Sequence, residues 1–149
     1  MEPIYDQNLV PRLIISFIAF AIAVGPMVAD FNKTHATNPL WPPHARFHVV
    51  WQVLTQSGVS ILALVLLWRE SGDYLFHLYV AAAIVYIWIA TFFATLASMR
   101  LFAGALRDTN GIEPFRFNIG GKVREVDTNL FGVVLFTLLN SLAVFLIQG

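Results

Sequence analysis

Four long apolar runs dominate this 149-residue sequence and limit the folds that it can adopt. They lie at about residues 9–29, 47–68, 75–100 and 130–147. A helix needs about 20 apolar residues to cross the hydrocarbon core of a membrane, and each run is close to that length or longer. Backbone polar groups in lipid must be paired within the protein, which favours helices for such runs. The sequence therefore predicts an all-α membrane protein, a bundle of four transmembrane helices.

The composition supports a membrane protein and excludes several other classes. Hydrophobic residues make up 58% of the chain and charged residues 12%, which are respectively above and below the usual shares in soluble domains. Basic and acidic side chains balance at nine each, so no net positive field is available to hold nucleic acid. The chain has no cysteine, so any metal ion must take nitrogen or oxygen ligands.

The connections between the runs predict a single domain that spans residues 1–149. The turn at 69–73 is short, so the second and third helices are expected to be antiparallel neighbours. The first run is expected to be a retained helix and not a secretory signal. Glu2 and Asp6 precede it, and Met-Val-Ala before Asp30 is a poor cleavage site.

The distribution of Lys and Arg predicts how the protein is oriented. The side that holds both termini and the 69–73 turn carries two such residues, Arg12 and Arg69. The side that holds the two long connections carries seven. Because basic residues are enriched in cytoplasmic loops, we expect the long connections in the cytoplasm and both termini on the other side.

The third connection predicts a small β-hairpin. The segments Phe115–Ile119 and Lys122–Val126 flank Gly120-Gly121, a pair that suits a two-residue hairpin turn. This register places Arg116 opposite Glu125. The hairpin is expected over the same membrane face as the first long connection. Candidate N-caps for the last helix follow it, at Asp127, Thr128 and Asn129.

Three of the four histidines lie in the first long connection or just after it. Ionisable side chains at the edge of a bilayer are costly to desolvate, so a dense group of them indicates a functional site. His44 and His48 are four residues apart on one helix face, where both can bind one metal ion or one substrate. His35 on the loop and Asp30 at the end of the first helix add further ligands that suit Fe, Cu or Zn. The four residues are therefore predicted as a catalytic or metal centre.

Two other interpretations of this group stay open. Without a metal, a histidine can exchange protons near neutral pH. Asp30 or Glu113 would orient it, and Trp41 or Trp51 would stabilise a developing cation. Alternatively, the imidazoles can pair with carbonyl groups and asparagines, and so hold an irregular, proline-rich loop. In either case Pro42-Pro43 fits the first turn of the second helix, where a missing N–H is tolerated.

Polar side chains on the second helix predict a face that looks into the bundle. At 100° per residue, His44, His48, Gln52 and Gln56 fall within one arc, and lipid cannot satisfy such groups. Asn140, near the middle of the last helix, also needs a partner inside the bundle. A second inward face is predicted on the third helix, at Trp88, Thr91, Thr95 and Ser98. The residues predicted to line a substrate site are Trp41, Arg46, Trp51, Gln52, Gln56 and Asn140.

The first connection also resembles that of a known family. The resemblance rests on the string Thr34-His35, Asn38-Pro39 and Trp41-Pro42-Pro43-His44-Ala45-Arg46-Phe47-His48, which covers roughly a tenth of the chain. With its pattern TH-xx-NP-x-WPPHARFH, this loop is similar to that of an uncharacterised family of small four-span membrane proteins. The resemblance implies the four-helix architecture and a functional role for the loop, and it implies no particular reaction.

These observations lead to two hypotheses of different classes. The first is a membrane-embedded enzyme, either a metal-dependent oxidoreductase or an acid–base isomerase. It would act on a lipophilic small molecule that enters between helices, with the 115–126 hairpin as a lid. The second is a non-catalytic subunit or scaffold of a larger membrane complex, in which the loop docks a partner through its Trp, Pro and Arg side chains. Self-association into a homo-oligomer is also open, although the sequence has no GxxxG motif to specify a dimer.

Overall fold

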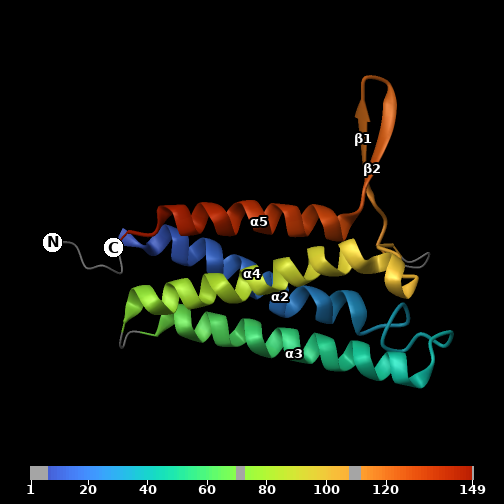
Figure 1. Ribbon diagram of the computed structural model, residues 1–149, viewed down its shortest axis with the longest axis horizontal. Coiled ribbons are helices and arrows are strands. Elements are labelled where there is room, and N and C mark those ends of the chain that lie inside the picture. Colours follow the sequence, from blue (N-terminus) through green and yellow to red (C-terminus); the bar gives the residue numbers. More distant parts are fainter. Residues whose placement is uncertain (1–6, 70–72, 108–111, 149) are drawn as a thin grey trace.

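A computed structural model describes residues 7–69, 73–107 and 112–148 of the chain. Within this part, four helices are long and apolar enough to cross a membrane, which confirms the predicted fold class. They lie alongside one another in one bundle (Figure 1). The helices are α2 (Leu9–Asp30), α3 (Pro43–Trp68), α4 (Tyr74–Ser98) and α5 (Thr128–Leu146). The shorter elements are a 3-10 helix, η1 (Met99–Phe102), and two strands, β1 (Phe115–Ile119) and β2 (Lys122–Val126).

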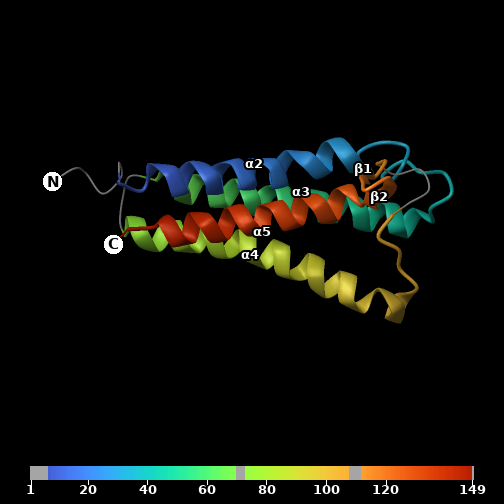
Figure 2. The same cartoon turned by 90° about the horizontal axis from the view of Figure 1, so that it is seen from above.

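The bundle has two distinct ends. The start of α2 and the end of α5 lie at one end, and the loop between α2 and α3 lies at the other, together with η1 and the hairpin (Figure 1). The two long connections therefore share one end of the bundle, as the sequence predicted. α4 packs against α3, α5 and α2, but it separates from its neighbours as it approaches η1 (Figure 2).

The packed core lies mainly in the half of the bundle near the chain termini. Ile15 and Ile18 of α2, Leu67 of α3 and Leu78 of α4 are fully or almost fully buried there. Small side chains at Ala19, Ala63, Ala81, Ala82 and Ala143 are also buried, and they allow the helix backbones to approach closely. Where α4 separates from its neighbours, this close packing gives way to open space.

Helix α2 continues through Pro26. Proline has no N–H, so the carbonyl group of Ile22 loses its usual helical donor. Side chains of α3 supply donors at this point. Gln56 Nε2 donates to the oxygen of Ile22 at 3.4 Å, and Ser57 Oγ donates to the oxygen of Ala23 at 2.7 Å. The proline therefore creates a place where α3 is hydrogen-bonded to the backbone of α2.

The hairpin has the predicted register, with Arg116 opposite Glu125. Arg116 Nε donates to Glu125 Oε1 at 3.1 Å. The two turn residues, Gly120 and Gly121, have φ angles of 59° and 76°, and a two-residue turn of type I′ needs positive φ at both positions. Of the three predicted N-caps, Asp127 is the one that accepts hydrogen bonds from the first turn of α5.

A buried asparagine joins the two ends of the described chain. The side chain of Asn8 is fully buried. Its Nδ2 donates to the backbone oxygen of Gln148 at 2.9 Å, and its Oδ1 accepts from the backbone N–H of Gln148, also at 2.9 Å. These two bonds fasten the start of α2 to the segment that follows α5.

We expect Asn8→Ala to lower the free energy of unfolding by about 1–3 kcal/mol, because it leaves two backbone groups of Gln148 without their partners. Thermal or denaturant unfolding in detergent measures this loss. Gln148→Ala is the matched control, because residue 148 takes part through its backbone alone. Equal stability of the two variants would show that the pair of bonds contributes nothing.

Candidate functional site

All four helices line a cavity of about 1070 Å³ that lies where α4 separates from its neighbours. Apolar side chains form much of its wall, among them Ile22, Val85, Val133 and Phe136. Polar side chains gather toward the end that carries the loop between α2 and α3, where Asp30, His48, Gln52 and Asn129 line the cavity. Sites for small molecules usually have volumes of roughly 300–1,000 Å³ and mostly apolar walls with a few polar groups. The cavity is therefore large enough for a lipophilic small molecule.

The polar face of α3 turns toward this cavity. His48, Gln52 and Gln56 line it, and so does Trp51. On α4, the predicted inward face contributes three of its four members, Trp88, Thr91 and Thr95. The role of any of these residues toward a substrate stays a prediction.

Three residues predicted to line a substrate site lie away from the cavity. Asn140 is fully buried, and its Nδ2 donates to the oxygen of Ala82 at 3.1 Å, so it joins α5 to α4. Arg46 lines a separate, shallow depression beside Ala36. The ring of Trp41 packs edge-on against His35 at the loop, with the ring centroids 5.1 Å apart.

His44 and His48 form a direct pair on the first turns of α3. Their Nε2 atoms are 3.0 Å apart, and their rings are nearly perpendicular, at 85°. At this distance one Nε2 must donate a proton and the other accept it. Both side chains are exposed, and of the two only His48 lines the cavity. The pair therefore lies where the cavity opens to the outside of the protein.

His35 and Asp30 form a second pair at the start of the loop. His35 Nδ1 lies 3.5 Å from Asp30 Oδ1 and 2.8 Å from Thr34 Oγ1. The hydroxyl group of Thr34 donates its single hydrogen to Asn32 Oδ1 at 2.6 Å, so His35 Nδ1 must be the donor toward Thr34. A neutral His35 then carries its hydrogen on Nδ1 and keeps Nε2 as an acceptor.

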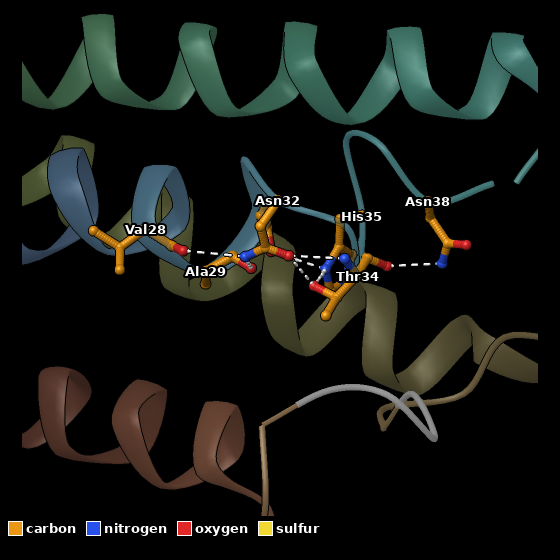
Figure 3. Close-up of polar contacts among 7 residues, drawn as sticks. Val28, Ala29, Asn32, Thr34, His35 and Asn38 are labelled. Carbon is orange, nitrogen blue, oxygen red and sulfur yellow. Dashed lines mark hydrogen bonds and ion pairs between the residues drawn. The ribbon is translucent and has the colours of Figure 1, made fainter.

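Asparagines, more than histidines, hold the loop in place (Figure 3). Asn32 Nδ2 donates to the oxygen of Ala29 at 2.8 Å, near the end of α2, and Asn32 Oδ1 accepts from the backbone N–H of Thr34, also at 2.8 Å. Asn38 is buried, and its Nδ2 donates to the oxygen of Thr34 at 2.9 Å. The loop is therefore structured by its own short-range hydrogen bonds. One interpretation of the sequence was that imidazoles hold the loop by pairing with carbonyl groups and asparagines. In the structure, asparagine side chains make these bonds to the loop backbone.

The four residues predicted to form one metal centre lie as two pairs. Asp30 and His35 pair at the start of the loop, and His44 and His48 pair on the first turns of α3. No group of three or more His, Asp or Glu side chains that could hold a metal ion is found in the described ranges 7–69, 73–107 and 112–148. His44 and His48 offer two converging nitrogens, and Asp30 with His35 offers a separate pair. A metal centre that uses all four residues stays a prediction.

The hairpin does not cover the cavity in this structure. None of its residues from 115 to 126 lines the cavity wall. It stands across the bundle axis at the start of α5 and points away from the helices (Figure 1). The residues just outside it, Ile112 and Thr128, do line the cavity. The sequence therefore located the hairpin at the correct end of the bundle, but the lid role expected for it is not matched by its position.

Two further cavity residues, Asn129 and Gly132 at the start of α5, were not predicted as site residues. Asn129 was expected only as an N-cap. A signal was present, because Asn129 and Gly132 are three residues apart and so lie on one helix face. This face turns toward α3 and α4 across the cavity.

Four apolar spans around a partly polar cavity define an integral membrane protein of the four-helix class. Residues 14–111 match a family described as a family of unknown function (DUF6640). The match covers well over half of the chain, including most of α2, all of α3 and α4, and the histidine loop, and the protein belongs to this family. No curated protein matches the sequence. No solved structure matches it either.

Removal of the Asn32 side chain should loosen the loop. We expect Asn32→Ala to speed amide hydrogen exchange in residues 31–41 by about tenfold or more, because the loss of a partly buried side chain that makes several hydrogen bonds costs about 1–3 kcal/mol. Lys33→Ala is the control, because the neighbouring Lys33 is exposed. Equal exchange in both variants would mean that the loop is held by something else.

Proposed function

We propose that the protein is a membrane-embedded enzyme that transfers protons to and from a lipophilic small molecule bound in the cavity. The observation that carries the proposal is the position of His48. It lines a large, mostly apolar cavity and shares a hydrogen bond with the exposed His44. An acid–base isomerase is the reaction class that fits, because it needs a proton to leave one atom of the substrate and return to another.

The apolar walls support a lipophilic substrate. Burial against side chains such as Val85 and Phe136 favours a hydrocarbon skeleton, whereas Asp30, Gln52 and Asn129 at the polar end would orient one oxygen or nitrogen function. The divergence of α4 from its neighbours supports entry from the lipid between helices (Figure 2).

The histidine pair supports proton exchange with the exterior. An imidazole can take up a proton on one ring nitrogen and release another from the second nitrogen. In this proposal His48 receives a proton from the substrate on Nδ1 and passes one from Nε2 to Nε2 of His44. Trp51 lies beside His48, with the ring centroids 5.9 Å apart, and its π face would stabilise the imidazolium form.

A metal-dependent oxidoreductase is the second candidate, and the distance between the two Nε2 atoms favours it. A tetrahedral ion with bonds of about 2.0–2.1 Å to each imidazole holds its nitrogens roughly 3.3 Å apart. The observed 3.0 Å needs only a small adjustment. Fe, Cu or Zn would suit these ligands, and two protein nitrogens would leave coordination positions for water or substrate.

The proposed orientation places the histidine loop and the hairpin in the cytoplasm. Seven Lys and Arg residues of the sequence fall in the connections at this end of the bundle or beside them, against two at the other end. This imbalance supports the positive-inside arrangement. His44 would then exchange protons with the cytoplasmic side.

A side chain added inside the cavity should displace the bound molecule. Gly132 and Gly58 both have open space where a Cβ atom would stand, but of the two only Gly132 lines the cavity. We expect protein purified in mild detergent, and also Gly58→Leu, to retain a lipophilic molecule that solvent extraction and mass spectrometry detect. Gly132→Leu should lose it. Equal retention in the two leucine variants would contradict binding in the cavity.

The histidine pair can be tested with the molecule identified in this way. We expect His48→Gln to lower turnover by about 10²–10⁴-fold while binding is retained, because glutamine keeps a hydrogen-bonding group but cannot relay a proton. His44→Gln should cause a smaller loss. Bound metal in the purified protein that is lost in both His44→Ala and His48→Ala would favour the metal-dependent candidate.

Full function in the His48 variant, with no bound metal, would contradict both catalytic candidates. The non-catalytic subunit would then be the remaining hypothesis. In that case Trp41→Ala should release a partner protein from the complex, whereas His48→Gln should leave the complex intact. Pull-down from solubilised membranes measures both.

A further inference from the structure

The hairpin has one apolar and basic face and one face of paired charges. Side chains directly opposite in the register share a face, so Phe117 lies beside Arg124, and Ile119 lies beside Lys122. Phe115 is on the same face, with its ring 6.4 Å from that of Phe117. This surface, called here the aromatic face, is outside the bundle, and all five side chains are exposed.

The opposite face has its charges balanced within the protein. Arg116 pairs with Glu125 at 3.1 Å, and Arg107 pairs with Glu113 at 3.0 Å. Longer contacts at 3.6 and 3.8 Å join the two pairs into one network. By contrast, neither Lys122 nor Arg124 forms an ion pair within the described part of the chain. The aromatic face therefore carries two unbalanced positive charges.

The contact between Phe115 and Phe131 shows which way the aromatic face is directed. The two rings meet edge-on, with their centroids 5.1 Å apart. Phe131 is in the first turn of α5 and is 43% exposed, on a helix that is itself long and apolar enough to span the membrane. Phe115 therefore points back toward the spanning part of the bundle. The aromatic face is directed toward the level of the lipid and not toward bulk water.

The orientation and the open edges of the hairpin limit the depth at which it can lie in a membrane. It runs across the bundle axis, so it extends roughly parallel to the membrane plane (Figure 1). A two-stranded sheet has unpaired backbone groups along both outer edges, and these are not tolerated in hydrocarbon. The hairpin is therefore excluded from the hydrocarbon, and the headgroup region is the nearest level at which water and phosphate groups can satisfy its edges.

The geometry points to the hairpin as an anchor in the membrane interface, which binds the anionic lipids of the leaflet next to it. Phe117 and Ile119 insert at the boundary between headgroups and acyl chains. Lys122 and Arg124 bind lipid phosphates, and the paired charges of the other face remain in water. Each basic residue near an anionic membrane surface strengthens the attachment by about fivefold. This role does not depend on the reaction proposed for the cavity.

The chain has no cysteine, so a single introduced cysteine can carry a nitroxide label. The full-length protein is reconstituted in vesicles of phosphatidylcholine with a third of phosphatidylglycerol. A label at Ile119→Cys on the aromatic face should collide more with oxygen than with a water-soluble nickel chelate. A label at Val123→Cys on the opposite face is the matched control and should show the reverse. Equal accessibility at the two positions would overturn the proposal.

A second arm tests the lipid charge. Lys122→Gln combined with Arg124→Gln, or vesicles of phosphatidylcholine alone, should shift the label at position 119 toward water, by about fivefold in partition for each charge removed. No shift in either case would overturn the requirement for anionic lipid. A label shielded from both oxygen and nickel would indicate a protein surface instead of lipid, and would also overturn the proposal. Unchanged thermal unfolding of the bundle confirms that the variants remain folded.

Discussion

The structure depends on one constraint, that polar groups within a membrane span must find partners inside the protein. Pro26 removes a helical donor, and Gln56 reaches from α3 to the carbonyl group of Ile22. Asn140 lies in the middle of α5, and its Nδ2 donates to the backbone of α4, whereas its buried Oδ1 has no hydrogen-bond partner among the described residues. In each case the polar atom fixes how two helices are positioned, because hydrocarbon offers no alternative partner. The bundle is therefore held by a few hydrogen bonds set among small apolar residues.

The same constraint explains why the polar groups gather at one end. Where α4 leaves its neighbours, a cavity opens, and the polar residues of α3 face this space instead of lipid. His48 and Gln52 can be tolerated there because the cavity and the loop side provide polar surroundings. The hydrogen-bonded asparagines of the loop then set where α2 ends and α3 begins, and so bring Asp30 and His48 to the same cavity. The hydrogen bonds that order the loop therefore also determine where Asp30 and His48 lie in the site.

Much of the fold could be predicted from the sequence, because its signals are local. Apolar length located the four helices, Pro42-Pro43 marked the start of α3, and Gly120-Gly121 fixed the hairpin register. The cavity could not be predicted, because it results from the angle at which α4 packs, and no single residue encodes that angle. The pairing of His44 with His48 followed from helical spacing, whereas the pairing of His35 with Asp30 depends on an irregular loop. The position of an amide near the middle of an apolar span indicated that Asn140 faces inward, but it could not distinguish a cavity residue from one that joins two helices.

The bond between Asn8 and Gln148 has a consequence for biogenesis. Its partners are 140 residues apart in the chain. During synthesis α2 leaves the ribosome long before the segment after α5 exists. Until that segment is made, the side-chain amide of Asn8 cannot bond to the backbone of Gln148. Insertion of the first helix and closure of the bundle are therefore separate events in time. A chaperone or the insertion machinery that shields this amide would act in the interval between them.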